Sequence, residues 1–391
     1  MRGLLQSDWE LPAPDGQSIG SLELLIPDGN AIRHYFMNPA QDPGLMIAGP
    51  NVPWSVGNPI AYFDQTIPKS VACIQSNFKG DGTHGNLEAI VRVSGPQGQD
   101  SLDFWYLDSS GGQGGPWSGP FPLMVDGSAV TGVTGNPALI QSTWGAKGNF
   151  ELLVPHGHAI NHYYRDNDSP GFPWHLAQQL SYPAVGSHHI GPFPLGVTFI
   201  QSDFMADGFH GNFEAIVRVA PPFRGDRLDF WYFDSAAAKW HGAFPVMVDR
   251  QEVDGVTGDP SLYSWPFRTC PFRPFELLVP CGRVIQQYER DNCVPSLPWR
   301  KAGKITYPPV APGTLASAVR DVDYIVARSL LSSPIGSIHS LTNGVAIVRL
   351  SPPPVVGEPD HFHYWSELNP DYKGPVPLIL TDGKLITATN L

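Results

Sequence analysis

A motif that recurs along the whole chain constrains its fold more than any other feature. Five segments, SLELLIPDG, NLEAIVRV, NFELLVPHG, NFEAIVRV and PFELLVPCG, each carry a glutamate, and steps of 65, 63, 63 and 62 residues separate Glu23, Glu88, Glu151, Glu214 and Glu276. A sixth copy, GVAIVRL, has Val345 in place of the glutamate. A fixed period of this size, with several short apolar runs in each unit, is typical of radial or linear repeat architectures.

The units alternate between two types. Units one, three and five carry ELL(I/V)P, then HYFMN, HYYRDN or QYERDN, and then a Pro-Trp pair that ends at Trp54, Trp174 and Trp299. Units two, four and six carry EAIVRV or VAIVRL, then DFWYLDS, DFWYFDS or HFHYWSE, and close on PLMVDG, PVMVDR or PLILTDG. The chain is therefore three copies of a two-unit module, and the last two units have diverged most.

Each unit contains about four strand-like runs that are rich in β-branched and aromatic residues. In unit four they are VTFIQSDF, NFEAIVRV, RLDFWYFD and FPVMV, separated by clusters of Gly, Pro, Asp and Asn. No long segment is apolar at a helical period, and 41 glycines with 41 prolines would interrupt one. We therefore expect an all-β fold, a six-bladed β-propeller of four-stranded antiparallel blades, in preference to a β-helix, which needs shorter repeats.

The two ends of the chain resemble the two halves of one junction. Inside the chain VTGNPALIQS (Val133 to Ser142) joins one unit to the next, whereas the chain starts with LLQSDW after three residues and ends with LITATNL. We expect these ends to meet and close the ring. The chain should then form a single propeller domain over residues 1–391, with blades near 1–70, 71–137, 138–197, 198–260, 261–318 and 319–391.

Charge and composition argue against several classes of partner. With 24 Lys and Arg against 36 Asp and Glu, the chain is acidic and has no basic stripe, so we expect no nucleic acid and no anionic membrane as partner. The N-terminal segment lacks the apolar core of a signal peptide and no run is long enough to span a membrane, which predicts a cytoplasmic protein. Reduced thiols, rather than disulfides, are the expectation for Cys73, Cys270, Cys281 and Cys293.

Neither a metal nor a cofactor is expected. Some histidines have suitable ligand chemistry, but no third ligand recurs with the pairs His156 and His158, His361 and His363, or His188 and His189. No P-loop, dinucleotide-binding, zinc-protease or nucleophilic-serine motif stands in a useful context. The recurrent glutamate fits a repeated hydrogen bond to the backbone of a neighbouring blade better than it fits five catalytic acids.

Aromatic residues are abundant, with 11 Trp, 13 Tyr and 20 Phe. Trp105 and Trp231 stand in DFWY at a strand period and should pack between blades. A second set stands in or near loops, close to the arginines of the RDN motif, and comprises Trp9, Phe78, Trp144, Phe204, Tyr35, Tyr163, Tyr164, Tyr288, Trp54, Trp174 and Trp299. Aromatic walls with a few fixed donors are typical of a pocket for a neutral organic ligand or a sugar face, although core packing accounts for part of this set.

The repeats QSDFMADGFHGNFEAIVRV and QSTWGAKGNFELLVPHGHAINHYYRDND resemble those of fungal and bacterial lectin-like β-propellers, over essentially all 391 residues. Sugar-binding propellers of this kind keep a nearly identical site in many blades, because their avidity depends on the number of copies. Here RDN occurs only in units three and five, unit one has MNP in its place, and unit six has diverged. This pattern indicates one unique pocket.

The size, the composition and the degenerate six-unit organisation are also similar to the fungal propeller hetero-Diels–Alderases of tropolone–sesquiterpenoid biosynthesis. That resemblance implies a cyclase of fungal secondary (meroterpenoid) metabolism. Its reaction is an intermolecular cycloaddition between a quinone methide, formed from a hydroxymethyl tropolone, and a humulene-type sesquiterpene. Such a pericyclase needs no nucleophile, metal or cofactor, because holding two hydrophobic small molecules in a reactive pose supplies much of the rate.

Candidate site residues follow from this chemistry, since no catalytic residue transfers with the resemblance. Hydrogen-bond donors to the tropolone oxygens would polarise the diene, and the candidates are Arg165, Arg290, His84 and His210. The substrate-binding walls would be Tyr164, Trp174, Trp299, Trp54, Trp9 and Trp144. Alternatively, the two arginines form surface salt bridges with their sequence neighbours, Asp166 and Asp291.

Three functions therefore remain open, and the single-pocket cyclase is the first of them. The alternative is a carbohydrate-binding lectin with sugar sites in or between the blades, and the third is a non-catalytic propeller that binds other proteins. Binding stoichiometry separates the first two. The cyclase should bind one ligand per chain, whereas a lectin should bind glycans at several equivalent sites.

Overall fold

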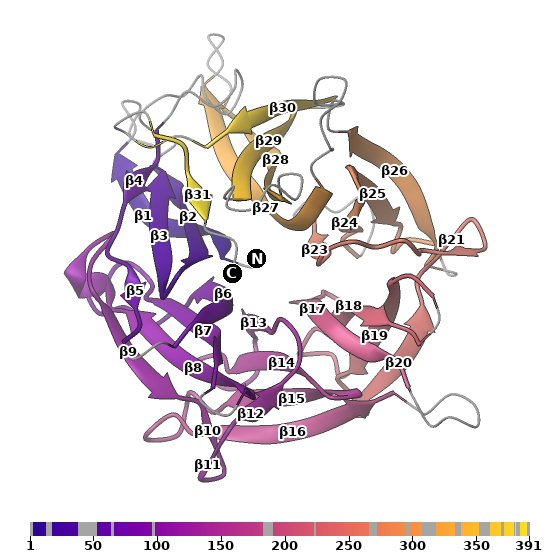
Figure 1. Ribbon diagram of the computed structural model, residues 1–391, viewed down its shortest axis with the longest axis horizontal. Helices are drawn as coiled ribbons and strands as arrows, with labels where there is room; N and C mark the ends of the chain where they lie inside the picture. The colour runs from indigo at the N-terminus through magenta and orange to yellow at the C-terminus, as the bar shows by residue number, and fades with distance from the viewer. Residues whose placement is uncertain are drawn as a thin grey trace.

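The protein is an all-β chain in the computed structural model (Figure 1). The structure describes residues 3–12, 18–37, 53–63, 66–95, 98–182, 191–222, 224–265, 272–294, 297–306, 318–332, 338–351, 360–368, 371–378, 380 and 384–388. Within these ranges the one helical segment is the 3-10 turn η2 (Ser109–Gly111), and no helix has the length and apolar character to cross a membrane. The predicted all-β class is confirmed.

Most strands pair antiparallel with their neighbours in sequence, forming a series of up-and-down runs. The first run is β1 (Leu4–Pro12), β2 (Ser18–Asp28), β3 (Ala31–Met37) and β4 (Ser55–Val56), with β5 (Ile60–Ala61) also on β3. The next is β6 (Pro68–Gln75), β7 (Leu87–Ser94), β8 (Asp100–Leu107) and β9 (Trp117–Pro122). It is followed by β13 (Ala138–Gln141), β14 (Phe150–His156), β15 (Ala159–Arg165) and β16 (Trp174–Ser181).

The second half of the chain continues the same pattern. Its first run is β17 (Phe193–Gln201), β18 (Phe213–Ala220), β19 (Arg227–Asp234) and β20 (Lys239–Pro245). The next run is β23 (Ser261–Ser264), β24 (Phe275–Cys281), β25 (Val284–Arg290) and β26 (Trp299–Thr306). The last is β27 (Ala318–Ser332), β28 (Ile338–Ser351), β29 (Asp360–Leu368) and β30 (Asp371–Pro377), with β31 (Thr387–Ala388) on β29.

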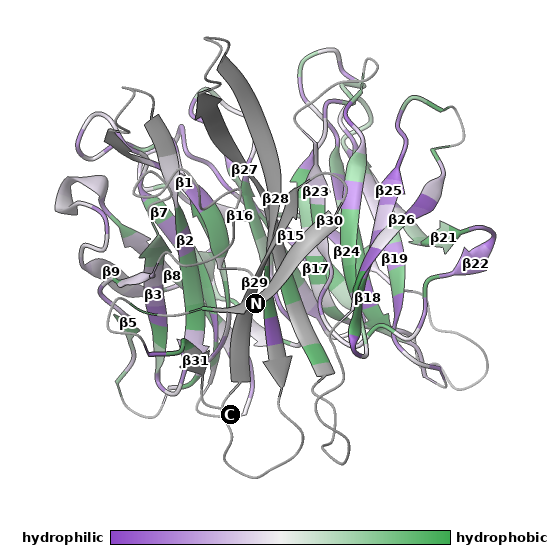
Figure 2. Cartoon of the chain, turned by 90° about the horizontal axis from the view of Figure 1, so that it is seen from above, coloured by the Kyte–Doolittle hydropathy of each residue, from purple (hydrophilic) through white to green (hydrophobic). Residues whose placement is uncertain are grey.

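The runs stand around a common centre, as the blades of a β-propeller do (Figure 1). Strands β6, β13 and β17 lie near the centre, and β16, β20 and β26 lie on the periphery. Hydrophobic residues are concentrated within the sheets, for example along β7 and β24 (Figure 2). Because alternate side chains of a strand point to opposite faces of its sheet, each sheet contributes apolar side chains to both of its neighbours.

A hydrogen bond between a tryptophan and a tyrosine joins successive runs within a module. Trp105 Nε1 donates to Tyr62 Oη at 2.8 Å, and both side chains lie in the core between the first two runs. Trp231 Nε1 donates to Tyr182 Oη at 3.0 Å in the equivalent core between the third and fourth runs. The prediction that Trp105 and Trp231 pack between blades is confirmed.

Hairpins join each module to the next one. Val125 pairs in parallel with Trp174 of β16, and Val248 pairs in the same way with Trp299 of β26. The pairing strands therefore reach across to the outermost strand of the following run. The connecting elements are β10 (Met124–Val125), β11 (Ser128–Ala129), β12 (Thr131–Val133), β21 (Met247–Val248) and β22 (Gln251–Glu252).

The same type of contact joins the last run to the first. Leu380 pairs in parallel with Trp54, which is 2% exposed. Trp54 lies in a core with Leu4 from β1, Ile347 from β28 and Ile386, which precedes β31. Described residues near both ends of the chain thus share one core, as the split junction motif predicts.

The prediction for the fourth strand of unit four is wrong. We expected it at FPVMV, but β20 is Lys239–Pro245, with the sequence KWHGAFP. Pro245 ends this strand because proline cannot donate a hydrogen bond to a strand ladder, and Met247–Val248 form the separate strand β21. The segment KWHGAFP was not recognised because glycine, lysine and alanine are depleted in strands.

The prediction of reduced thiols is confirmed for Cys73 and Cys281, which are free, and wrong for Cys293, which is disulfide-bonded. Cys270 lies outside the described residues. Disulfides persist mainly in oxidising compartments, so the cysteine content no longer supports a cytoplasmic location, which remains a prediction.

Candidate functional site

A cavity of about 650 Å³ lies where the segment from β9 to β11 meets β15 and β16. The hairpin reaches this place because Val125 pairs with Trp174. Four stretches of sequence contribute to the lining, which consists of Phe104, Phe121, Pro122, Leu123, Met124, Asp126, Gly127, Arg165, Gly171, Phe172, Pro173, Trp174 and His175. Two of the predicted site residues, Arg165 and Trp174, therefore line one cavity.

Arg165 is the buried cation of this cavity, with 5% of its surface exposed. Its guanidinium carbon lies 3.8 Å from the ring centroid of Phe150, 5.1 Å from Phe104, 5.3 Å from Phe172 and 5.5 Å from Phe78. A cation is attracted to the negative face of an aromatic ring, and more strongly where water is excluded. The four rings therefore hold the guanidinium in place and also shield it from water.

One hydrogen bond orients the guanidinium. Arg165 Nε donates to Asn167 Oδ1 at 2.7 Å, and Asn167 is fully buried. No hydrogen bond or ion pair joins the two terminal nitrogens of Arg165 to another residue in the described ranges. Burial lowers the pKa of Arg165 to about 10, and the charge of Glu88 opposes this lowering. Arg165 therefore remains a cation at neutral pH.

The rim of the cavity combines exposed aromatic rings with polar groups. Phe121 and Phe172 are 47% and 41% exposed, which is unusual for residues of this size. His175 Nδ1 lies 3.3 Å from Asp126 Oδ1. Tyr164, another predicted site residue, lies just outside the lining, with its ring 5.1 Å from that of His175.

The same arrangement recurs around Arg290, with one difference. Arg290 is 3% exposed, and its guanidinium carbon lies 4.8 Å from Phe230 and 4.9 Å from Phe275. Its Nη1, however, lies 3.5 Å from Glu214 Oε2. Arg290 therefore has a counter-ion inside the protein at contact distance, whereas Arg165 has none among the described residues.

The surface salt bridges considered as an alternative for the two arginines are not formed. Arg165 and Arg290 are buried, and their neighbours Asp166 and Asp291 accept hydrogen bonds within their own turns. The first module of the chain, which contains β2 and β3, has no arginine at this position. Met37 pairs with Leu22 in β3 and β2, at the register where the other modules carry the arginine.

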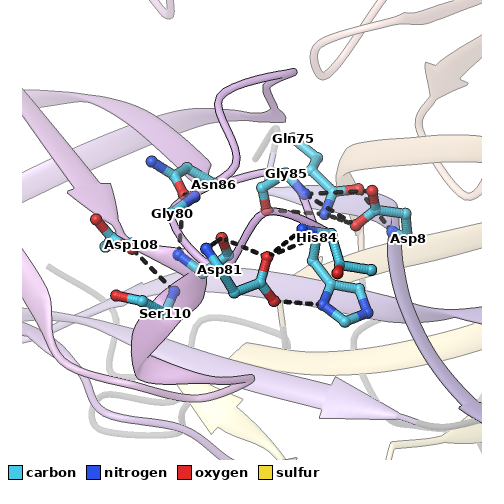
Figure 3. A network of polar contacts seen from close by, with 11 residues as sticks. Asp8, Gln75, Gly80, Asp81, His84, Gly85, Asn86, Asp108 and Ser110 are labelled. Atoms are coloured by element: carbon cyan, nitrogen blue, oxygen red, sulfur yellow. Dashed lines mark hydrogen bonds and ion pairs between the residues drawn. The ribbon is translucent and has the colours of Figure 1, made fainter.

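His84 lies in the loop between β6 and β7, within the polar network of Figure 3, and it is not one of the residues that line the cavity. Its backbone N–H donates to Asp81 Oδ1 at 2.7 Å, and its Nδ1 lies 2.6 Å from Asp81 Oδ2. The hydrogen bond from His84 holds the pKa of Asp81 below its usual range. Trp9 lies close by, with its ring 6.4 Å from that of His84, so this pair belongs to the contact between the first two runs.

His210 occupies the equivalent loop between β17 and β18. Asp207 holds its Nδ1 at 2.7 Å, and its ring stacks on Trp144 at 4.0 Å with an interplanar angle of 9°. Neither residue lines the cavity. The structure thus places the predicted site residues at several separate contacts, with Arg165 and Trp174 together, Tyr164 beside them, Arg290 near the start of β26 at Trp299, and Trp54 in the core that joins the chain ends.

The recurrent glutamates are buried, and in the part of the chain that the structure describes Glu23, Glu88, Glu151 and Glu214 accept from side chains, not from the backbone of a neighbouring blade as predicted. Glu151 Oε1 accepts from Ser142 Oγ at 2.9 Å, and its Oε2 lies 2.9 Å from His162 Nε2. Backbone groups of the neighbouring strands are already engaged in the ladders, so the carboxylate bonds to side chains instead. The same pattern joins Glu23 to Ser7 and His34, and Glu276 to Gln287.

Glu88 and Glu214 interact with the charges of the buried arginines Arg165 and Arg290 rather than with a histidine. Burial raises the pKa of Glu88 and that of Glu214 to about 7, while the charges of Arg165 and Arg290 respectively oppose the rise. Each carboxyl also accepts a hydrogen bond from a serine of its own sheet. These two groups therefore change charge near neutral pH inside the protein.

Most of the cavity lining was not predicted from the sequence. Phe104, Phe121, Phe172 and His175 were not among the candidate site residues. One signal was present, because the PLMVDG motif that supplies Met124 to Gly127 recurs in units four and six. This motif indicates a cavity only when the strand that its hairpin contacts is known, and here that strand is β16.

No group of three or more His, Cys, Asp or Glu side chains is placed to hold a metal ion among the residues that the structure describes. His156 and His158 contact different carbonyl oxygens, of Thr131 at 3.1 Å and of Pro192 at 3.2 Å. The side chains of the other two histidine pairs lie outside the described set.

No family model matches the chain, and no curated protein matches it in sequence. A similar solved structure is an exo-beta-1,3-galactanase from Phanerochaete chrysosporium with beta-1,3-galactotriose, at 10% identity over 89% of this chain and 81% of that chain, with a TM-score of 0.43. Another is a GH43 beta-1,3-galactosidase, at 8% identity over 95% and 81%, with a TM-score of 0.41.

A third is a bifunctional GH43-CE protein from Bacteroides eggerthii, at 9% identity over 96% of this chain and 55% of that chain, with a TM-score of 0.39. None of these three is a hetero-Diels–Alderase. Since the TM-scores are below 0.5, the function of the cavity is argued from its own residues.

Proposed function

We propose that the chain is a carbohydrate-binding protein whose sugar site is the cavity at Arg165. The observation that carries the proposal is a guanidinium that is 5% exposed, held by Asn167, and left with terminal donors that engage no described residue. A buried charge costs free energy unless it is paired or hydrogen-bonded. A ligand rich in oxygen acceptors would supply the missing hydrogen bonds.

The rim of the cavity fits the rest of a sugar. The exposed rings of Phe121 and Phe172 offer apolar surface to the C–H face of a pyranose, and Asp126 and His175 offer an acceptor and a ring nitrogen to its hydroxyl groups. The Arg165 cavity combines these features with terminal nitrogens that engage no described residue, whereas Glu214 Oε2 lies 3.5 Å from Nη1 of Arg290. We therefore infer one glycan site per chain.

The test is a glycan array followed by calorimetry with the best binder. Arg165→Gln should weaken binding about tenfold or more, because a hydrogen bond to a charged group contributes about 1.5–3 kcal/mol. Phe121→Ala should weaken it about threefold or more through lost ring contact, which contributes about 0.5–1.5 kcal/mol. Matched controls are Arg33→Gln, at a half-exposed arginine paired with Asp28, and Phe209→Ala, at a ring 81% exposed.

Both controls should bind like the wild-type chain, with a stoichiometry of one. Absence of binding to any glycan at millimolar concentration would contradict the proposal. Equal losses in the control variants would also contradict it, because the cavity would then not be the site.

We also propose that the propeller has six blades of four antiparallel strands and forms one domain over residues 1–391. Two observations support this count. Each of the six sequence units supplies one up-and-down run in strand order, and hydrophobic cores lie between successive runs, including the last and the first. An experimental density map with another number of blades would refute the count.

A second candidate function is the hetero-Diels–Alder cyclase that the sequence resemblance implies. One observation favours it: most of the cavity lining is apolar, and Arg165 could donate to tropolone oxygens. Incubation with a hydroxymethyl tropolone and humulenol tests this candidate. Product formed above the background rate, with one enantiomer in excess, would support the cyclase, and a racemic background product would exclude it.

A further inference from the structure

Aromatic rings surround Arg165 and Arg290, and we call each set of rings an arginine cage. The two cages differ in the way the buried positive charge is neutralised. Around Arg290, the Glu214 carboxylate lies 3.5 Å from Nη1. Around Arg165, the corresponding carboxylate of Glu88 accepts from Ser76 Oγ at 3.1 Å, and no ion pair joins it to the arginine. Glu88 therefore acts on Arg165 only through its field, as its opposing effect on the arginine pKa indicates. The cavity at Arg165 contains a cation without a contact anion in the described structure.

The geometry of the cage selects among possible anions. Phe150 lies at 3.8 Å from the guanidinium carbon, and Asn167 holds Nε, so the remaining fork of two terminal nitrogens has a fixed plane. A fixed guanidinium fork matches the two oxygens of a carboxylate through parallel hydrogen bonds. Hydrogen bonds of this type are about twice as strong as those to a neutral hydroxyl.

The other charged groups described near the cavity do not serve as the counter-ion of Arg165. Asp126 stands at the rim with its side chain 66% exposed and faces His175 at 3.3 Å. Lys147 Nζ lies 5.8 Å from the ring centroid of Phe172, which lines the cavity, and adds a second positive charge. Because Asp126 is solvated and Arg165 is buried, water screens the repulsion of a bound anion by Asp126 more than its attraction by Arg165.

We propose that the saccharide bound in this cavity carries a carboxylate, as a uronic acid does, and that Arg165 binds this carboxylate through its two terminal nitrogens. This inference rests on the proposed carbohydrate-binding function and specifies its ligand class. Binding supplies the contact anion that the Arg165 cage lacks and that Glu214 supplies to the other cage.

The experiment compares trigalacturonic acid with its methyl ester, which keeps the shape of the sugar and removes the charge. In calorimetry the wild-type chain should bind the acid about tenfold or more tightly than the ester. Arg165→Gln should reduce this ratio to about one. Arg165→Lys should retain part of the ratio, because lysine keeps the charge without the fork. Arg33→Gln, which removes one exposed positive charge, should leave the ratio unchanged.

A second variant tests whether a folding defect, rather than the loss of the arginine, explains the result for Arg165→Gln. Since Arg165→Gln leaves Glu88 without an opposing charge, the double variant Arg165→Gln/Glu88→Gln keeps the buried site neutral, and it should also lose the preference for the acid. Equal binding of acid and ester by the wild-type chain would overturn the inference. Binding of neutral glycans alone would overturn it too, while leaving the proposed function intact, and only a lack of binding to every glycan would refute both.

Discussion

Trp54→Ala is expected to lower the free energy of unfolding by about 3–5 kcal/mol, as large-to-small changes of a buried tryptophan do. Trp54 is 2% exposed and pairs with Leu380, in a core that also contains Leu4 and Ile386. That core joins residues near the two ends of the chain, so its loss should also loosen the contact between the first and last runs. Urea unfolding and hydrogen exchange measure the two effects.

The matched control is Trp299→Ala. Trp299 is 8% exposed and pairs with Val248 in the same way, but its core joins two runs in the middle of the chain. We expect a similar loss of stability in the control without faster exchange in β1 and β2. A loss below about 1 kcal/mol for Trp54→Ala, or equal exchange of β1 and β2 in both variants, would contradict the assignment of this core as the closing contact.

The stability of the protein is expected to fall as the pH rises from about 5 to about 8, through Glu88 and Glu214. Burial raises the pKa of each carboxyl from 4.5 to about 7. Below pH 4.5 both are protonated in the folded and the unfolded chain, and their contribution to stability is complete. As the pH rises toward 7 the unfolded chain releases these protons first, so the contribution is lost.

The loss amounts to about 3 kcal/mol for each group, on the order of the free energy that such a pKa change represents. Urea unfolding of the wild-type chain at pH 5, 6, 7 and 8 should show the decline. In the double variant Glu88→Gln/Glu214→Gln the slope should become shallower by the contribution of the two groups. Glu289→Gln, at an exposed glutamate of β25, should keep the wild-type slope. An unchanged slope in the double variant would refute the assignment.

Local sequence patterns were sufficient for the strands and for much of the packing between them. Runs such as NFEAIVRV were predicted as strands because they are short, rich in β-branched and aromatic residues and bounded by turn residues, and β18 covers Phe213 to Val219 of this run. Trp105 and Trp231 could be placed between blades because they stand at a strand period in such runs. The pattern failed at β20, where the sequence KWHGAFP has weak strand propensity and is held by its pairing with β19.

The candidate cavity was only partly visible in sequence. Arg165 and Trp174 were selected, because a charged residue among aromatics at the end of a strand is conspicuous. Phe121 and Asp126 were not selected, because they come from another repeat unit. They meet Arg165 only through the parallel pairing of Val125 with Trp174, and no local pattern specifies that contact.

The sequence by itself determined the repeat, its alternation in two-unit modules and the all-β class, because period and strand propensity are properties of neighbouring residues. It also placed the same RDN motif after Tyr164 and after Glu289. Only the tertiary structure decided that Arg290 pairs with Glu214, while Arg165 is held by Asn167 and its two terminal nitrogens engage no described residue. The physical reason is that a charge pair depends on the distance between side chains of different sheets. That distance is set by the packing of the aromatic cage, and it differs between two segments that read alike.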